Sequence, residues 1–299
     1  MQPSLLRLFD LPLSARYMLV SSLGFALMGA CVKAAGASGL PVLEIVAVRA
    51  LISLVLSFID IRRKRIPMLG QNRPLLMLRG VFGTIALIAV FYSVTTLPIA
   101  QAILLQYIHP TFTAVLALFF LKERINLGTV LCIVLSFIGL SLVTAPQWSA
   151  HSTTDISWLA IAAALTGAFT SACAYVVVRK LAQTEDPSVI VIYFPMVAAP
   201  ISAVLLIAQQ SFVVPTLYQL TLLVAIGVLV QIAQIALTKA MSVENAGKVS
   251  AYGYIQVVFA ALLGMMFFDE IPTGWTLAGG VFIIAGAFIN SWKKSLKSR

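Results

Sequence analysis

Ten long apolar stretches, separated by short polar connections, dominate this sequence. A helix needs about 20 apolar residues to cross the roughly 30 Å hydrocarbon core of a bilayer, and each stretch is near that length. Of the 299 residues, 61% are apolar and only 10% are charged, whereas soluble domains carry about 25% charged residues. We therefore expect an all-α integral membrane protein. Its ten predicted transmembrane helices are 17–35, 42–60, 75–92, 98–120, 127–144, 156–178, 188–208, 217–238, 246–267 and 274–292.

The stretch 97–139 recurs as 244–286 at a single offset, without gaps. Aligning Glu123 with Glu270 sets that offset at 147 residues. Other identical pairs at this offset are Tyr107/Tyr254, Thr129/Thr276 and Gly139/Gly286. Matches of Tyr, Glu, Thr and Gly are harder to obtain by chance than apolar matches, so they indicate an internal duplication.

The duplication predicts two halves of five spans each. We expect an N-terminal tail at 1–16, a first repeat at 17–144, an extracytoplasmic connection at 145–155, a second repeat at 156–292 and a C-terminal tail at 293–299. Because five is an odd number, the halves should insert with opposite orientations. Inverted repeats of this kind place a binding site near the membrane midplane, where the halves meet.

The distribution of Lys and Arg predicts the orientation in the membrane. Cytoplasmic loops carry an excess of these residues. If both termini are cytoplasmic, 18 of the 20 basic residues lie on that side, Arg79 among them, and only Lys33 and Arg49 remain. We therefore predict a multi-pass protein of the cytoplasmic (inner) membrane with both termini inside.

Composition also excludes several classes of function. The net charge of +10 resides in short loops rather than on a basic stripe interleaved with aromatics, which argues against nucleic-acid binding. The three cysteines lie within apolar runs and form no CxxC, which is typical of small buried residues. The spans carry no nucleophile–His–acid set, metal cluster or nucleotide-binding loop, so we expect no cofactor and no enzyme. An intramembrane enzyme and a non-transporting scaffold remain the alternatives from other classes.

Several short motifs occur in a characteristic order. They are Pro41-x-x-Glu44 followed by Arg49, then Arg79-Gly80-x-x-Gly83, Phe91-Tyr92, Leu97-Pro98 and Leu121-Lys122-Glu123. Together they resemble the EamA branch of the drug/metabolite transporter superfamily, over nearly the whole chain. The resemblance implies a ten-helix basket with a central cavity and secondary transport of small metabolites. The second half departs from the pattern, because no Arg-Gly-x-x-Gly precedes its third span.

Arg49 is the first candidate for a substrate contact. It lies 8 residues after Pro41, about 12 Å along its helix. A cation at such a depth costs roughly 2.5–3.5 kcal/mol on insertion scales, so it should face a cavity or a partner. Substrate binding and a structural role, as an ion pair or in helix capping, both remain open. Glu44 lies five residues earlier, which is not on the same face of an ideal helix. Lys33, near the end of its span, is explained equally by snorkelling.

Polar residues at helical spacing mark three further spans. These stripes are Gln106/His109/Thr113, Gln231/Gln234/Thr238 and Tyr252/Gln256. Each stripe is either hydrogen-bonding between helices or cavity lining, and their occurrence on repeat-related helices favours a shared cavity. Pro110 should loosen its helix and free a backbone carbonyl. Six aromatic residues are candidate cavity walls, with simple packing as the alternative: Phe91, Tyr92, Tyr107, Tyr175, Tyr193 and Tyr254.

These features predict a secondary transporter that works by alternating access through a central cavity. The expected substrate is a small polar metabolite, an amino acid or related compound, and the expected direction is export. The alternative is uptake of an anionic or nucleoside-like metabolite or a vitamin. A lipid bilayer and the small-molecule substrate are the expected partners, and the sequence leaves the oligomeric state open, with a monomer compatible.

Overall fold

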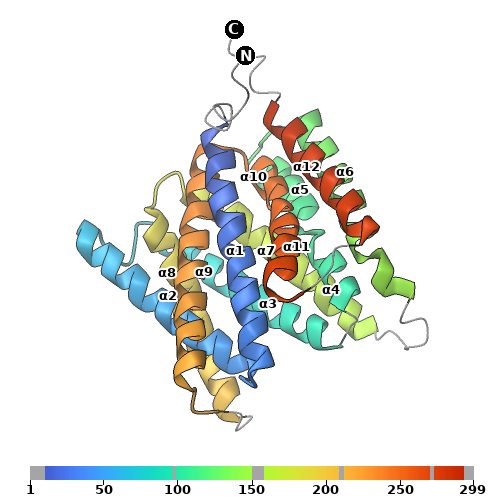
Figure 1. The fold of residues 1–299 in the computed structure, drawn as a ribbon. Coiled ribbons are helices and arrows are strands. Elements are labelled where there is room, and N and C mark those ends of the chain that lie inside the picture. The colour runs from blue at the N-terminus through green and yellow to red at the C-terminus, as the bar shows by residue number, and fades with distance from the viewer. Residues whose placement is uncertain (1–10, 97–98, 150–157, 209–211, 270–272, 293–299) are drawn as a thin grey trace, which may run out of the picture.

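The computed structural model describes residues 11–96, 99–149, 158–208, 212–269 and 273–292, and all regular structure within these ranges is helical (Figure 1). A helix satisfies every backbone donor and acceptor internally, which hydrocarbon requires. The first repeat contains α1 (Leu13–Ala37), α2 (Val42–Lys64), α3 (Arg73–Thr96), α4 (Ile99–Gln106), α5 (His109–Phe120) and α6 (Leu127–Ser149). The second contains α7 (Trp158–Leu181), α8 (Pro187–Ala208), α9 (Leu217–Val243), α10 (Ala246–Tyr252), α11 (Ile255–Phe267) and α12 (Gly274–Trp292).

These helices make the ten expected spans, because α4 continues into α5 and α10 continues into α11. By length and composition, eight segments of the described chain are apolar enough to cross a membrane, and α5 and α12 are shorter apolar helices. Large apolar side chains such as Phe119, Phe120 and Ile207 are exposed on the outside, as a lipid-facing surface requires. The start of α1 and the end of α12 lie on the same side of the molecule (Figure 1). The predicted fold class is confirmed.

Helix packing follows a two-fold pattern between the repeats. α1 packs on α9, and their repeat counterparts α7 and α3 pack on each other. α2 packs on its own counterpart α8, and α6 packs on its counterpart α12. The turns after α5 and α11 also match, since Lys122 and Asp269, which are 147 residues apart, both have φ of 53°.

The contact between α6 and α12 shows the symmetry in atomic detail. A Cβ added at Gly139 would lie 2.5 Å from the carbonyl oxygen of Gly279, and one added at Gly286 would lie 3.1 Å from that of Cys132. At the 147-residue offset, Gly139 corresponds to Gly286 and Cys132 to Gly279. The contact of Gly139 with Gly279 is therefore repeated, with the two repeats exchanged, as the contact of Gly286 with Cys132. A contact that is repeated in this way has two-fold symmetry.

Both discontinuous spans are interrupted at the same repeat position. α4 gives way to α5 at Tyr107, and α10 gives way to α11 at its counterpart Tyr254. The Tyr254 hydroxyl donates to the Tyr107 carbonyl at 2.8 Å, and the two rings stack with centroids 5.7 Å apart. Since repeat counterparts can touch only beside the symmetry axis, both interruptions lie at that axis.

Only the first interruption has a clear signal in the sequence. Pro110 lies in the first turn of α5, as expected, and the Gln106 carbonyl that it frees lies 3.1 Å from Nδ1 of His109. The second span carries Gly253 instead of a proline at its interruption, and the sequence did not indicate a break there. Outside the described residues lie Leu97, Pro98, Glu270, positions 1–10 and 293–299 of the expected tails, and positions 150–155 of the expected connection.

Candidate functional site: a polar cavity between the two repeats

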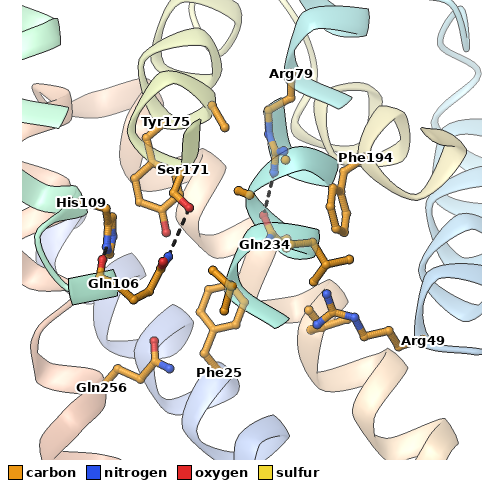
Figure 2. A pocket seen from close by; sticks show the side chains of 16 residues that line it. Phe25, Arg49, Arg79, Gln106, His109, Ser171, Tyr175, Phe194, Gln234 and Gln256 are labelled. Atoms are coloured by element: carbon orange, nitrogen blue, oxygen red, sulfur yellow. Dashed lines mark hydrogen bonds between the residues drawn. The ribbon is translucent and has the colours of Figure 1, made fainter. Parts of the chain in front are cut away.

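A cavity of about 250 Å³ lies where the repeats meet, and side chains from both halves line it (Figure 2). Five of the predicted site residues are among its lining: Arg49, Gln106, His109, Gln234 and Gln256. They come from α2, α4, α5, α9 and α11, so each of the three polar stripes contributes at least one member. The structure thus brings these residues together, and their role as substrate contacts stays a prediction.

Gln231 lies apart from the cavity lining and joins two helices. Its Oε1 accepts a hydrogen bond from Ser53 at 2.5 Å, and its Nε2 donates to Ser57 at 2.7 Å. The side chain is 5% exposed. Gln231 therefore links α9 to α2, one of the two roles that the sequence left open.

The other stripe members lie outside the lining as well. The hydroxyls of Thr113 and Thr238 donate to carbonyls one turn earlier in their own helices, those of His109 and Gln234. Tyr252 is 2% exposed and belongs to the main apolar core.

Among the candidate aromatic walls, Tyr92 and Tyr107 are likewise absent from the lining. Tyr107 stacks on Tyr254, and Tyr92 is 41% exposed. Substrate contact by these residues and by Gln231 and Tyr252 remains a prediction that the cavity geometry does not support.

Arg79 lines the cavity, whereas the count of basic residues placed it with the connection between the second and third spans. It does not lie in that connection, because α3 begins at Arg73 and carries Arg79 about 9 Å inward. The side chain is 5% exposed, its Nη2 donates to Gln234 Oε1 at 3.4 Å, and its guanidinium lies 5.5 Å from the ring centre of Phe194. Without Arg79, the remaining Lys and Arg residues of the loops still favour the same predicted orientation in the membrane.

Two glycines of the Arg79-Gly80-x-x-Gly83 motif set the position of this arginine. A Cβ at Gly80 would lie 2.6 Å from the Tyr193 carbonyl oxygen, so α3 approaches the backbone of α8 closely. A Cβ at Gly83 would collide with the Arg79 guanidinium and lie 2.7 Å from the Phe194 ring. The motif therefore provides space for a cation one turn away, and this spacing is the signal in the sequence that marks Arg79.

Arg49 does not pair with Glu44. Glu44 Oε2 instead accepts a hydrogen bond from the Val213 backbone at 3.1 Å. Arg49 Nη1 lies 3.7 Å from the thioether sulfur of Met28, a weak acceptor. Among the described residues that line the cavity, none is Asp or Glu. Two guanidinium groups therefore face it without a carboxylate in its wall.

Ser171, Tyr175, Phe25 and Phe194 complete the wall around the polar groups. Ser171 accepts a hydrogen bond from Gln106 Nε2 at 3.3 Å, and Tyr175 packs edge-on against the His109 ring. Tyr175 is one of the candidate aromatic walls of the sequence, and the structure places it in the lining. The other three carried no signal, because their faces depend on how α1, α7 and α8 pack.

A polar network centred on Glu123 joins the turn after α5 to the second repeat. Its Oε1 accepts from Arg179 Nε at 2.6 Å, and its Oε2 accepts from the Ala246 backbone at 2.7 Å. Arg179 also donates through Nη1 to the Met241 carbonyl at 2.5 Å. We call these four residues the Glu123 network; it ties the turn after α5 to α7, α9 and α10.

Next to the central cavity lies a second cavity of about 230 Å³, which shares Phe25 and Gln256 with the first. Its wall includes Lys33, whose ammonium group lies 4.2 Å from the ring centre of Phe268. Phe25 therefore stands between the central cavity and the end of α1.

A membrane protein with ten spans in two inverted repeats, and with a polar cavity where they meet, has the architecture of a small-molecule transporter. The chain belongs to the EamA-like transporter family, whose model matches residues 13–145 and 158–292. The family and its members are named as transporters and not as enzymes, and this protein is a multi-pass membrane transporter of that family.

Curated relatives span most of the chain. A pseudopaline exporter, CntI, of Pseudomonas aeruginosa is 34% identical over 276 residues, which are 92% of this chain and 94% of that protein. Solute carrier family 35 member G1 of Mus musculus is 27% identical, covering 87% of this chain and 74% of its own. An S-adenosylmethionine uptake transporter of Rickettsia prowazekii is 29% identical over 77% of each chain. A solved crystal structure at 19% identity and a TM-score of 0.84, covering 95% of this chain and 99% of its own, shares the fold.

Proposed function

We propose that this protein is a secondary transporter that exports a small polar metabolite carrying a carboxylate, such as an amino acid or related compound, across the inner membrane. The observation that carries the proposal is the pair of arginines, Arg49 and Arg79, in a cavity whose described lining holds no acid. Arginine binds carboxylates through charge-assisted and often bidentate hydrogen bonds.

Alternating access follows from the different closures at the two ends. The Glu123 network joins both repeats, and we propose that it closes the cytoplasmic end of the cavity in this conformation. At the other end, the second cavity reaches Lys33 past Phe25. Rocking of one repeat against the other, with exchange of these closures, would expose the cavity to each side in turn.

The direction of transport has two candidates. The relative that is 34% identical is named an exporter, which supports export, whereas the relative at 29% is named an uptake transporter, which supports the alternative. Of these two, the exporter is matched over the larger share of both chains. We therefore propose export, with uptake of an anionic or nucleoside-like metabolite as the second candidate.

Counterflow in proteoliposomes tests the proposal. Vesicles that contain the purified protein and an excess of unlabelled amino acids or related carboxylates should accumulate the matching labelled compound, while protein-free vesicles should not. Imposed gradients of either sign then report the direction. Failure of every carboxylate metabolite in the panel, with accumulation of neutral or cationic compounds instead, would contradict the proposal.

A further inference from the structure

We propose that the substrate carries two carboxylates, one bound by Arg79 and the other by Arg49, and a hydrogen-bond donor that faces Gln106. This inference rests on the proposed function and specifies the chemistry of its substrate. It depends on how charge and unpaired polar atoms are distributed over the wall of the central cavity.

The cavity has one cationic wall and one neutral wall. Arg49 and Arg79 lie on one side with Phe194, whereas Gln106, His109 and Gln256 lie on the other (Figure 2). The arginines come from α2 and α3, so they are separate binding groups on separate helices. A substrate that spans the cavity therefore meets cations at one end and neutral hydrogen-bonding groups at the other.

A single carboxylate would leave one of the two cations without a counterion. The hydrogen bonds that the structure gives these guanidinium groups are long and go to uncharged acceptors, Met28 Sδ at 3.7 Å and Gln234 Oε1 at 3.4 Å. The buried Nε of Arg79 has no hydrogen-bond partner among the described residues. An unpaired buried charge is costly, so we expect a second carboxylate of the substrate to pair with the second guanidinium group.

The neutral wall requires a different group. Gln106 donates through Nε2 to Ser171, but its buried Oε1 has no hydrogen-bond partner among the described residues. An amide oxygen accepts hydrogen bonds and cannot bind a carboxylate. Gln106, His109 and Gln256 together present neutral polar groups to the cavity, so we expect an N–H or O–H group of the substrate on this side, which orients the molecule between the two walls.

The size of the cavity favours a compact molecule. Its volume of about 250 Å³ lies just below the usual lower limit for small-molecule sites, about 300 Å³. A short chain that places both carboxylates on the side of the arginines and an amine or hydroxyl group on the side of Gln106 fits these limits.

Binding of matched probes to the purified protein tests this inference. Glutamate and glutamine have nearly the same size and differ by one carboxylate, and glutarate and its monoamide form a second such pair. Succinate and adipate vary the separation of the two carboxylates. We expect calorimetry to show tighter binding of the dicarboxylate in at least one pair, by about tenfold to hundredfold, since a hydrogen bond to a charged group contributes about 1.5–3 kcal/mol.

Arg49→Gln and Arg79→Gln should each reduce that preference to less than about threefold, by loss of dicarboxylate affinity and not by gain of monoamide affinity. Arg49→Lys should restore part of it. Thermal melting checks that the variants fold. If a variant does not fold, the comparison of the matched probes on the wild-type protein still tests the inference. Equal affinities within both pairs, or no binding of any dicarboxylate in the series, would overturn the inference.

Counterflow separates this inference from the proposed function. If the protein transports a monocarboxylate but shows no preference within either pair, the inference is wrong and the proposed function stands. If the dicarboxylates bind selectively and no compound is transported, the proposed function is wrong and the assignment of the site stands.

Discussion

At the scale of single residues, two glycines, which have no side chain, position the Arg79 guanidinium as much as its side-chain contacts do. Gly80 lets α3 approach the backbone of α8, and Gly83 leaves the space that the guanidinium occupies against Phe194. Gln234 then holds the group from α9. Arg79 is therefore oriented by three helices, two of which belong to the second repeat.

Gly83→Ala should displace Arg79 without removing it. Its Cβ would collide with the guanidinium, so we expect dicarboxylate affinity to fall by about tenfold, the equivalent of roughly 1.4 kcal/mol. Calorimetry measures this change. Gly280→Ala is the matched control, because a Cβ there has no neighbour within 4 Å. Equal affinities in the two variants would show that Gly83 does not position the arginine.

Gln231 and Gln256 should respond in opposite ways to replacement by leucine. Gln231→Leu removes the hydrogen bonds to Ser53 and Ser57, so thermal unfolding should report a loss of about 0.6–1.7 kcal/mol with transport per folded molecule unchanged. Gln256→Leu alters the cavity wall and should lower counterflow by about tenfold while the melting temperature stays close to that of the wild type. Loss of transport in the first variant alone would reverse the two assignments.

At the scale of helices, the interrupted spans and the Glu123 network connect the cavity to the ends of the molecule. The interruptions bring Tyr107 and Tyr254 together at the symmetry axis, beside Gln106 and Gln256 of the cavity wall. One turn beyond α5, Glu123 contacts α7 and the start of α10. In the transport cycle proposed above, a movement between the repeats breaks this contact when the cavity opens at that end.

Glu123→Gln should therefore favour opening at that end. The change removes the charge that Arg179 and the Ala246 amide contact, while the shape of the side chain is kept. In a variant with the native cysteines replaced by alanine and a cysteine at position 174 in the cavity wall, we expect a membrane-impermeant thiol reagent added on the cytoplasmic side to react about tenfold faster.

Glu244→Gln provides the control for that experiment. It makes the same charge change beside α10, where Glu244 pairs with Lys248 at 3.3 Å, one turn away along the chain. Labelling in this variant should match that of the parent. Similar acceleration in both variants would indicate a general effect of charge and not release of the Glu123 network.

At the scale of the whole molecule, an odd number of spans in each of two related halves produces the inverted arrangement. The two-fold contacts between α6 and α12 and between the two interrupted spans follow from it. The relation to the membrane is a separate matter, since the orientation depends on the basic residues of the loops and not on packing within the protein.

Reporter fusions test the orientation directly. A reporter joined after Asn72 should report the cytoplasm, because Arg62, Arg63 and Lys64 in the last turn of α2 and Arg65 directly after it precede this position. A reporter joined after Trp148 should report the opposite side. The reverse result at either position would contradict cytoplasmic termini.

The sequence by itself determined the fold class. Apolar length sets the number of spans, because a helix of fixed rise must cross a hydrocarbon layer of fixed thickness. The 147-residue offset and the odd number of spans set the relation between the halves. It also identified five cavity residues, because polar groups on apolar helices must find each other, water or a ligand.

Tertiary structure alone decided which polar residues bond to neighbouring helices and which face the cavity. Gln231 and Gln234 lie three residues apart on one face of α9, yet the first bonds to Ser53 and Ser57 of α2 and the second to Arg79 of α3. A periodic pattern specifies a face of one helix, whereas the role of a side chain depends on which other helix lies opposite. Arg79 shows the same limit, because its burial depends on where α3 begins and on its packing against α8.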